Sequence, residues 1–262
     1  MKTILDTIIE HKQGEVAARR KAVPEKALER EPLFSRTCLS VKPFLLDPER
    51  TGIIAEFKRQ SPSKGVINDK VDVVQVTGDY ARFGASCLSV LTDEKFFGGS
   101  TADLMRARFN AIPILRKDFV IDEYQIVEAK AMGADLILLI AACLRPAEVQ
   151  RLTKFARGLG LDILLELHAE EELAHICDEI DLVGINNRNL KTFEVDIDRS
   201  LRMAEKLPAR AITIAESGIS TTAAVRLFKQ HGFSGFLMGE NFMKEADPGQ
   251  AFAKFARELK TA

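Results

Sequence analysis

Short apolar segments alternate with amphipathic helical segments from residue 51 to the end of the chain, and this alternation constrains the fold most strongly. Several helical segments end in glycine, which is typical of the left-handed residue that closes a helix before the next strand. The apolar segments predict eight strands: Gly52–Phe57, Ser86–Leu91, Ile112–Leu115, Leu136–Ala141, Ile163–Leu167, Leu182–Ile185, Ala211–Ala215 and Gly235–Met238. Continuous apolar strands that alternate with helices indicate a parallel sheet covered by helices.

Eight such units within about 210 residues favour an α/β fold of the closed (β/α)8 TIM barrel type. An open dinucleotide-binding sheet has a glycine-rich fingerprint after its first strand, and none follows Phe57. The first fifty residues lie outside the eightfold count, and their helical patterns at Ile4–Lys21 and Pro24–Glu29 predict an N-terminal helical extension. We therefore predict a single (β/α)8 barrel domain over residues 1–262, with the extension at 1–50 and the barrel at 51–262.

The overall charge gives no reason to expect a nucleic-acid or membrane partner. Lys and Arg number 37 and Asp and Glu number 38, so any anion binding must be local. The longest apolar run, "LILLIAACL", is much shorter than the ~20 residues of a membrane span. The amphipathic N-terminus does not resemble a signal peptide, and four scattered cysteines without a C-x-x-C pair indicate reduced thiols. We expect a cytoplasmic protein.

Polar residues recur at the carboxyl ends of the predicted strands, which is where barrels of this type carry their chemistry. Any one of them could be a rim salt bridge or a helix cap, but the repetition over several strands favours a common site. The residues are Glu56, Lys58, Lys117, Glu166, Asn186, Arg188, Glu216, Ser217, Gly218, Gly239 and Glu240.

Strand parity brings several of these side chains to the same face, because alternate residues of a strand share a face. Glu56 and Lys58 share the face of Ile54, and the same spacing relates Lys117, Glu166 and Glu216 to apolar residues two positions earlier. If this face points inward, lysines, carboxylates and an amide converge at the barrel mouth. Buried charges of this kind must be paired with opposite charges or take part in the chemistry, since burying an isolated charge costs much free energy.

Three loops suggest a phosphate site. "AESGIS" and "LMGEN" place small residues and backbone N–H groups where these barrels commonly hold a phosphate. Gly218 and Gly239 would let the backbone approach an anion, and "SPSKG" offers a hydroxyl from Ser61 or Ser63. We predict a phosphorylated small-molecule substrate, with the loop around Lys64 closing over it.

Other chemical signatures are weak. The four histidines lack metal-ligand spacing, so we expect no metal. His168 lies near the fifth predicted strand and could line the rim, but a surface position or a role that supports other site residues is favoured. The aromatic pair Phe96–Phe97, together with Phe119, could belong to the core or could form a wall for a flat substrate, and both interpretations stay open.

Seven strings, in order from Ile53 to Met243, resemble the motifs of the indole-3-glycerol-phosphate synthase family. They are "IIAEFKRQSPSKG", "SVLTDEKFFGGS", "LRKDFVIDEYQI", "LLELH", "GINNRNLKTFEVD", "AESGIS" and "LMGENFM". The resemblance implies the cofactor-free ring closure of 1-(2-carboxyphenylamino)-1-deoxyribulose 5-phosphate to indole-3-glycerol phosphate, carbon dioxide and water. Asn241–Phe242 replaces the more usual Ser–Leu, which leaves a phosphate-binding backbone plausible.

The resemblance also implies roles for individual residues. Lys117 resembles the general acid that protonates the ketone-derived oxygen, Lys58 the lysine that contacts the substrate carboxylate, and Glu166 the carboxyl group that helps expel the hydroxyl. Glu56 resembles the charged partner of the lysines, and Asn186 and Glu216 match residues that hold and polarise the substrate. The substrate-binding positions would be Ser61, Phe97, Phe119, Arg188, Ser217, Gly218, Gly239 and Glu240.

Electrostatics and size lead to further expectations. We expect neighbouring cations and burial to lower the pKa of Lys117, opposed by adjacent carboxylates, which would suit proton donation near neutral pH. The chain has no room for a fused isomerase domain, so we expect a monofunctional monomer. The alternatives are a Schiff-base aldolase that uses Lys117 or Lys58, another phosphate-binding barrel of tryptophan or histidine biosynthesis, and a non-catalytic barrel that binds a phosphorylated ligand.

Overall fold

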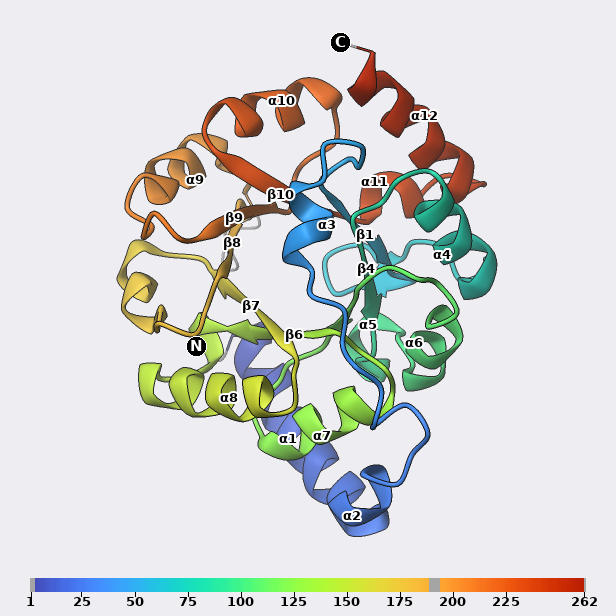
Figure 1. Ribbon diagram of the computed structural model, residues 1–262, viewed down its shortest axis with the longest axis vertical. Helices are drawn as coiled ribbons and strands as arrows, with labels where there is room; N and C mark the ends of the chain where they lie inside the picture. Colours follow the sequence, from blue (N-terminus) through green and yellow to red (C-terminus); the bar gives the residue numbers. More distant parts are fainter. Residues whose placement is uncertain (1–2, 189–193, 262) are drawn as a thin grey trace.

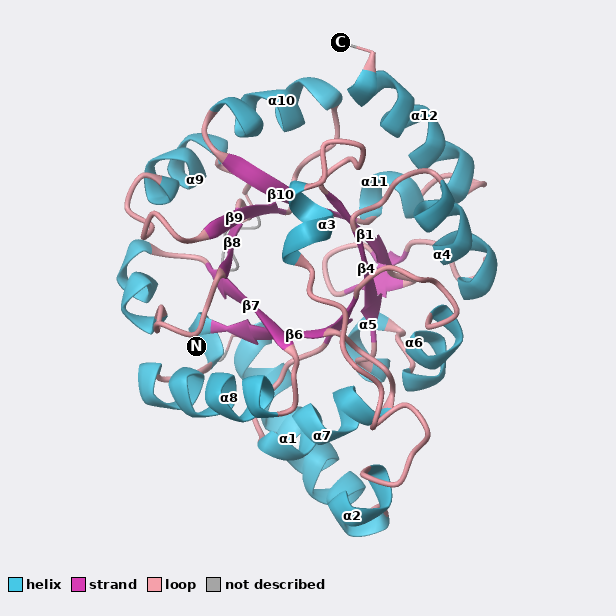
Figure 2. Ribbon diagram, in the orientation of Figure 1, coloured by secondary structure: helices cyan, strands magenta, loops and turns pink. Residues whose placement is uncertain are grey.

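A computed structural model describes residues 3–188 and 194–261, so part of the string "GINNRNLKTFEVD" lies outside the described residues. Over these ranges eight parallel strands close into a barrel in the order β1-β10-β9-β8-β7-β6-β5-β4, which confirms the predicted TIM barrel (Figures 1 and 2). The strands are β1 Ile53–Phe57, β4 Cys87–Leu91, β5 Ile114–Lys117, β6 Leu136–Ile140, β7 Asp162–Leu167, β8 Leu182–Asn186, β9 Ile212–Glu216 and β10 Phe233–Met238.

Each predicted strand overlaps an observed one, and the largest shift concerns β5. It begins at Ile114 rather than at the predicted Ile112 and runs on to Lys117. Pro113 explains the later start, because proline has no N–H to donate to the strand ladder. Lys117 is consequently part of the strand itself, and the backbone pairing of β5 fixes its direction.

Helices follow the strands as an outer ring (Figure 2). The ring consists of α4 Val73–Arg82, α6 Thr101–Ala107, α7 Glu123–Ala131, α8 Pro146–Gly158, α9 Ile197–Ala204, α10 Thr222–Gln230 and α12 Pro248–Lys260. Shorter elements are α5 Glu94–Phe97, α11 Glu240–Met243, the 3-10 turns η1 Ala141–Cys143 and η2 Glu170–His175, and an unpredicted hairpin of β2 Gln60–Ser61 and β3 Gly65–Val66. Gly84, Gly133, Gly160 and Gly232 have φ between 80° and 97°, which confirms the left-handed helix ends.

The barrel has two apolar layers that follow strand parity. Ile54, Leu115, Leu164 and Ile214 belong to the cluster inside the barrel. Their neighbours in the chain, such as Ile53, pack between the sheet and the helices. The face that the sequence assigned to chemistry is therefore the inward face, and side chains further along the same rows emerge at the carboxyl ends of the strands.

The N-terminal extension reaches both ends of the barrel. It contains α1 Ile4–Ala22, α2 Glu25–Leu28 and α3 Lys42–Leu46. α3 lies across the amino ends of the strands, where Val41 and Leu45 join the inner cluster and the backbone N–H of Val41 donates to Asp162 at the start of β7 (Figure 1). The first turns of α1 lie at the opposite end, over the carboxyl ends of the strands.

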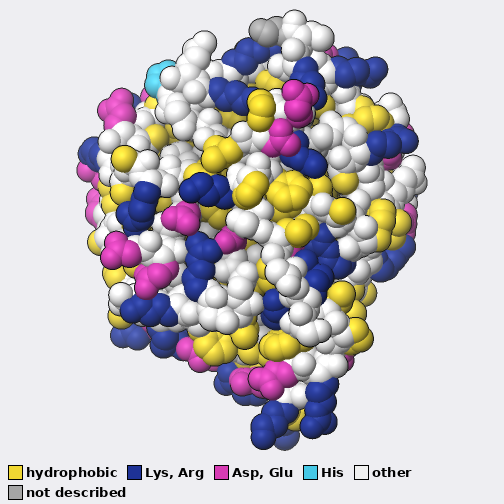
Figure 3. All heavy atoms as spheres, in the orientation of Figure 1, with side chains coloured by type: hydrophobic (Ala, Val, Ile, Leu, Met, Phe, Trp, Pro, Cys, Tyr) yellow, Lys and Arg dark blue, Asp and Glu magenta, His cyan; other side chains and the backbone are white. Residues whose placement is uncertain are grey.

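The face that carries α3 has acidic, basic and apolar side chains interspersed, without a field of one sign (Figure 3). Within residues 3–188 and 194–261, no helix is long and apolar enough to cross a membrane. Over the same ranges, no group of three or more His, Cys, Asp or Glu side chains is arranged to hold a metal ion.

Candidate functional site

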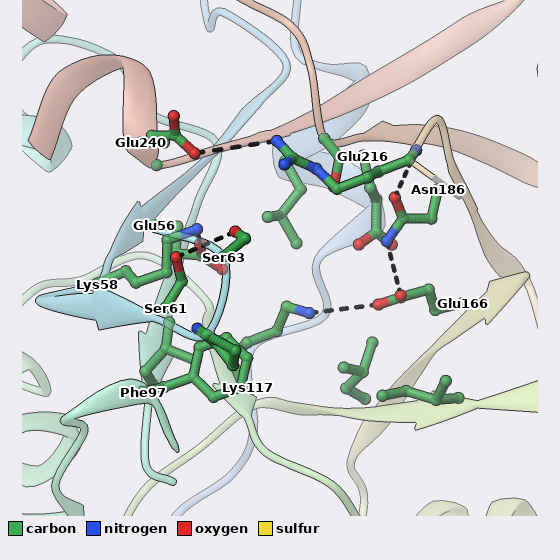
Figure 4. A pocket seen from close by; sticks show the side chains of 18 of the residues that line it. Glu56, Lys58, Ser61, Ser63, Phe97, Lys117, Glu166, Asn186, Glu216 and Glu240 are labelled. Carbon is green, nitrogen blue, oxygen red and sulfur yellow. Dashed lines mark hydrogen bonds and ion pairs between the residues drawn. The ribbon is translucent and has the colours of Figure 1, made fainter. Parts of the chain in front are cut away.

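A pocket of about 220 Å³ opens at the carboxyl ends of the barrel strands. All fourteen residues that the sequence predicted for catalysis or substrate binding line it. The close-up in Figure 4 shows that the side chains of Lys117, Glu166 and Asn186 point toward one another. They are Glu56, Lys58, Ser61, Phe97, Lys117, Phe119, Glu166, Asn186, Arg188, Glu216, Ser217, Gly218, Gly239 and Glu240.

The centre of the pocket is an ion pair across the barrel. The Nζ of Lys117, at the end of β5, lies 3.3 Å from the Oε2 of Glu166, which projects inward from β7. The amide of Asn186 on β8 donates to the other oxygen of Glu166 over 2.9 Å (Figure 4). Glu166 is buried, so these partners supply the stabilisation that water gives an exposed carboxylate.

A second pair comes from the first strand. Glu56 on β1 lies 2.9 Å from the Nζ of Lys58, and Ser89 on β4 donates to its other oxygen over 3.3 Å. Burial opposes ionisation of Glu56, but Lys58 and Lys117 outweigh this effect and lower its pKa. We call Glu56, Lys58, Lys117, Glu166 and Glu216 the pocket cluster.

Glu216 differs from the other carboxyl groups of the pocket cluster. A glycine on the neighbouring strand makes room for it, because a Cβ at Gly184 would lie 2.0 Å from its Oε1. That oxygen is buried and has no hydrogen-bond partner among the described residues. Burial and the nearby charge of Glu166 raise the pKa of Glu216 well above its ordinary value, whereas Lys117 and His168 hold that of Glu166 low against the effect of burial. The surroundings therefore shift the pKa values of these two neighbouring carboxyl groups in opposite directions.

The expected lowering of the Lys117 pKa is wrong. Burial does lower it, but the charges of Glu166, Glu216 and Glu56 act in the other direction and together raise the pKa above its ordinary value. The sequence reasoning gave too much weight to neighbouring cations. Lys117 is consequently an ammonium group, surrounded mainly by carboxyl groups, throughout the neutral range.

The loops after β9 and β10 approach the pocket through their backbones. Gly218 has φ 71° and Ser217 has φ 66°, a left-handed conformation that is uncommon outside glycine. A Cβ at Gly239 would lie 2.8 Å from the Cβ of Glu56, so only glycine fits this approach without displacement. The pocket therefore has a rim of backbone close to the charged side chains, which is suited to an anion.

The hairpin loop after β1 lies close to the start of α11, which follows β10. Lys64 lies 3.7 Å from Glu240, and Arg188 lies 3.9 Å from the same carboxylate. The hydroxyls of Ser61 and Ser63 are 3.5 Å apart on the pocket side of the hairpin (Figure 4). Two cations and two hydroxyls thus surround the part of the rim where the sequence placed the phosphate.

One wall of the pocket is apolar. The rings of Phe97 and Phe119 are 5.9 Å apart and tilted by 42°, and both line the cavity. Phe96 instead packs against His11, so of the two adjacent phenylalanines only Phe97 meets the pocket. Ile4, Leu5 and Ile8 of α1 also line the cavity. Apolar side chains therefore face the charged side of the pocket, as a flat aromatic substrate with polar substituents requires.

His168 is a site residue whose importance the sequence reasoning missed. It is buried, lines the pocket, and places its Nε2 2.7 Å from the Oε1 of Glu166, so the expectation of a surface position is wrong. The signal was available in the sequence, because His168 follows Glu166 by two residues, as Lys58 follows Glu56. The same parity rule therefore places it on the inward face.

A second group of buried charges lies behind the pocket and was also missed. The Nζ of Lys12, on α1, is fully buried and lies 2.9 Å from both Asp93 and Asp118. Arg116 is fully buried as well, 3.2 Å from Asp118 and 3.1 Å from Glu128. We call Lys12, Asp93, Arg116, Asp118 and Glu128 the anchoring cluster, because it joins α1 to the barrel.

The anchoring cluster supports two parts of the pocket wall. Asp93 accepts the backbone N–H groups of Phe96 and Phe97 and so begins the short helix α5. Asp118 follows Lys117 directly in the chain. Arg59 points away from the pocket, because it pairs with Asp103 of α6 and stacks on Phe57.

Comparison with known proteins agrees with this geometry. The family model described as "Indole-3-glycerol phosphate synthase" matches residues 5–255. Proteins of that name from Bacteroides thetaiotaomicron and Acinetobacter baumannii are 46% and 44% identical, covering 99% and 95% of this chain and 100% and 94% of their own lengths.

Among solved structures, the tryptophan synthase α-subunit of Pyrococcus furiosus superimposes with a TM-score of 0.61 at 17% identity, over 81% of this chain and 99% of its own, which shows the shared barrel fold. The match of the family model over almost the whole chain, together with these sequence identities, shows that the chain belongs to the indole-3-glycerol phosphate synthase family.

Proposed function

We propose that this chain catalyses the decarboxylative and dehydrative ring closure of 1-(2-carboxyphenylamino)-1-deoxyribulose 5-phosphate to indole-3-glycerol phosphate, carbon dioxide and water. The observation that carries the proposal is the arrangement of Lys117, Glu166 and Glu216 at the centre of a pocket with an apolar wall and a rim suited to an anion. Membership of the family supports the same reaction.

Lys117 supplies the proton for ring closure. When the ring carbon attacks the ketone carbon, the ketone oxygen becomes an alkoxide, which is a stronger base than an amine. An ammonium group whose pKa is raised by surrounding carboxyl groups stays protonated until such a base appears. When carbon dioxide leaves, the electron pair of the broken carbon–carbon bond returns to the ring and restores its aromatic system. This step therefore needs only proton transfers.

The other polar side chains at the centre of the pocket have separate roles in the reaction. Lys58, held 2.9 Å from Glu56, contacts the carboxylate of the substrate. Glu166 helps the hydroxyl to leave, and Asn186 fixes the orientation of that carboxylate by its hydrogen bond. Glu216, kept protonated, donates a hydrogen bond that polarises the substrate.

The phosphate and the aromatic ring bind against different parts of the pocket wall. The phosphate lies against Ser61 and the backbone of Ser217, Gly218, Gly239 and Glu240, with Arg188 nearby. The aromatic ring lies against Phe97 and Phe119, under the first turns of α1. This placement orients the reacting carbon atoms toward Lys117.

The electrostatics disfavour the aldolase alternative. A Schiff base forms from a neutral amine, and enzymes of that kind lower the pKa of the reacting lysine. Here the carboxyl groups raise the pKa of Lys117, and Lys58 is paired with Glu56. Neither lysine is therefore prepared as a nucleophile.

The experiment that tests the proposal is a fluorescence assay with the substrate. The chain contains no tryptophan, so the appearance of indole fluorescence can be followed without a background from the protein. We expect product formation by the purified protein without added metal or cofactor. Absence of indole fluorescence at any pH between 6 and 9, with binding of indole-3-glycerol phosphate intact, would refute the catalytic assignment and favour a non-catalytic binding protein.

We further propose that the chain works as a single-domain, monofunctional monomer in the cytoplasm. The Bacteroides relative is matched over its entire length, which supports a one-function chain. The four cysteines are free thiols, consistent with a reducing compartment. Light scattering at micromolar concentration measures the assembly state, and a dimer mass would contradict the monomer.

A further inference from the structure

His168 lies at the end of β7 in contact with the carboxylate at the centre of the pocket, and none of the proposed chemical steps uses it. Its side chain is only 8% exposed and lines the cavity. Its Nε2 lies 2.7 Å from the Oε1 of Glu166, the same oxygen that accepts the Asn186 amide. A buried imidazole at this distance from a carboxylate strongly favours the charged form of that carboxylate when it is itself protonated.

The surroundings of Glu166 and Glu216 are unequal. Glu166 accepts hydrogen bonds from the Lys117 ammonium on one oxygen and from the Asn186 amide on the other. The Nε2 of His168 lies 2.7 Å from that second oxygen, as an ion pair without hydrogen-bond geometry. The Oε1 of Glu216 has no hydrogen-bond partner among the described residues, and it lies over Gly184, the residue that pairs with Glu166 between β7 and β8. When two close carboxyl groups hold one proton, the proton rests on the group that has fewer positive partners.

We propose that protonated His168 is a positioning residue that keeps this shared proton on Glu216 and leaves Glu166 as the ionised group. The inference rests on the proposed function and deepens it, because it sets which carboxyl group acts in each role. Loss of the imidazole charge would let the proton divide between Glu166 and Glu216, so that neither group is fully available for its task.

The groups around His168 come from several elements. Glu166 belongs to β7, and Glu172 of η2 adds a further negative charge while its carboxylate accepts the backbone N–H of His168 over 2.6 Å. Beyond Glu166 lie Lys117 of β5 and Glu216 of β9. Burial opposes the charged ring, but Glu166 and then Glu172 outweigh it and raise the pKa of His168. The imidazolium form therefore persists to a pH above the ordinary histidine value.

The test compares the pH dependence of kcat in the unaltered protein and in His168→Gln and His168→Asn. In the unaltered protein, we expect kcat to fall about tenfold as the pH rises through the His168 titration, which lies above the ordinary histidine value of about 6.5. Both variants should lack this step, show kcat about tenfold lower at pH 6, and approach the unaltered protein at alkaline pH. His231→Gln, at an exposed histidine, is the matched control and should keep the original profile.

Two measurements keep the outcome decisive. Circular dichroism and calorimetric binding of indole-3-glycerol phosphate report whether the variants are folded. An NMR titration of the four histidines in the unaltered protein locates the His168 pKa without any substitution. A variant that keeps the step, an equal loss of activity at every pH, or a His168 resonance that titrates outside the range of the kcat step would overturn the inference. An unaltered protein that forms no product would instead refute the proposed function.

Discussion

The pocket cluster and the anchoring cluster lie on the two sides of β5, and three consecutive residues contribute to them. Lys117 points into the barrel toward Glu166, while Arg116 and Asp118 point outward toward Glu128 and Lys12. Both clusters contain buried cations and carboxylates, so their composition is similar. They differ in exposure: every member of the pocket cluster lines the cavity, whereas in the anchoring cluster Asp118 alone does. Lys12, Asp93 and Arg116 have no accessible surface at all.

This difference in exposure corresponds to a difference in charge balance. In the anchoring cluster, burial disfavours the ionised form of Asp118, yet Arg116 and Lys12 lower its pKa to about 2. In the pocket cluster, Glu216 has Glu166 as its close neighbour and its pKa is raised. Cations thus hold Asp118 of the anchoring cluster ionised, whereas the raised pKa of Glu216 lets the pocket cluster keep a proton in reserve. An ion network that only holds elements together needs the first arrangement, and proton transfer needs the second.

The largest effect is expected from Lys117→Met, which removes the proton donor of the pocket cluster. We expect kcat/KM in the indole fluorescence assay to fall by about 10³-fold, within the range for a lost general acid. Calorimetry should find the affinity for indole-3-glycerol phosphate unchanged within about tenfold, because the phosphate contacts lie elsewhere. Lys154→Met, at an exposed lysine on α8, is the control. Retention of activity in Lys117→Met would remove the distinction between the two clusters.

The next effect is expected from Lys12→Met in the anchoring cluster. This substitution leaves Asp93 and Asp118 buried without their shared cation, and breaking a buried ion pair in this way costs about 3–5 kcal/mol. Urea unfolding followed by circular dichroism measures the loss. Lys21→Met, at an exposed position on the same helix, should change the stability very little.

A second substitution sharpens this result. In the Lys12→Met background, Asp118 keeps its pair with Arg116, whereas Asp93 has lost its cation. Asp93→Asn removes this uncompensated charge and should restore part of the lost stability, so the two changes are not additive. Strict additivity would mean that Lys12 acts through packing of its chain alone. The anchoring cluster would then not be an electrostatic unit.

The smallest effect is expected from Glu216→Gln, which should change how the free energy of unfolding depends on pH. The pKa of Glu216 is raised in the folded protein, so its stabilising effect is complete below the unfolded pKa of 4.5 and is lost as the pH rises toward the folded pKa. Glutamine cannot ionise. As the pH rises from the unfolded pKa toward the folded one, the variant should therefore lose less stability than the unaltered protein, by about 1 kcal/mol per pH unit.

Urea unfolding at pH 6, 7 and 8 measures this slope, with Glu205→Gln at an exposed position as control. Equal slopes for Glu216→Gln and the unaltered protein would show that Glu216 is ionised throughout this range. The proton in reserve, which separates the pocket cluster from the anchoring cluster, would then not exist.

The sequence predicted the pocket cluster more completely than the anchoring cluster, for a physical reason. Strand parity and the common direction of parallel strands are local rules, and they sufficed to place Glu56, Lys117, Glu166 and Glu216 at one mouth. Lys12 follows Ile8 by one helical turn on the buried face of α1, which marks it as unusual. Its partners Asp93 and Asp118 are far away in the chain, so no local pattern could identify them.

The sequence alone could not predict the direction in which the pKa of Lys117 shifts, for a related reason. It depends on the sum of burial and of three carboxyl groups from three different strands. The sequence indicates which groups converge, but the sign of the sum depends on their separations. The position of His168, by contrast, was predictable from the sequence. The parity rule that places Lys58 on the inward face also places His168 there, two residues after Glu166.

The extension that covers both ends of the barrel has a consequence for biosynthesis. The first fifty residues leave the ribosome before any barrel strand, yet α3 contacts β10, and the backbone carbonyl of Glu49 accepts a hydrogen bond from Lys260 near the end of the chain. Contacts between such distant residues form late in folding. The segment that is made first can therefore complete its contacts only after β10 has been made. Until then, the apolar side chains of α3 stay unburied.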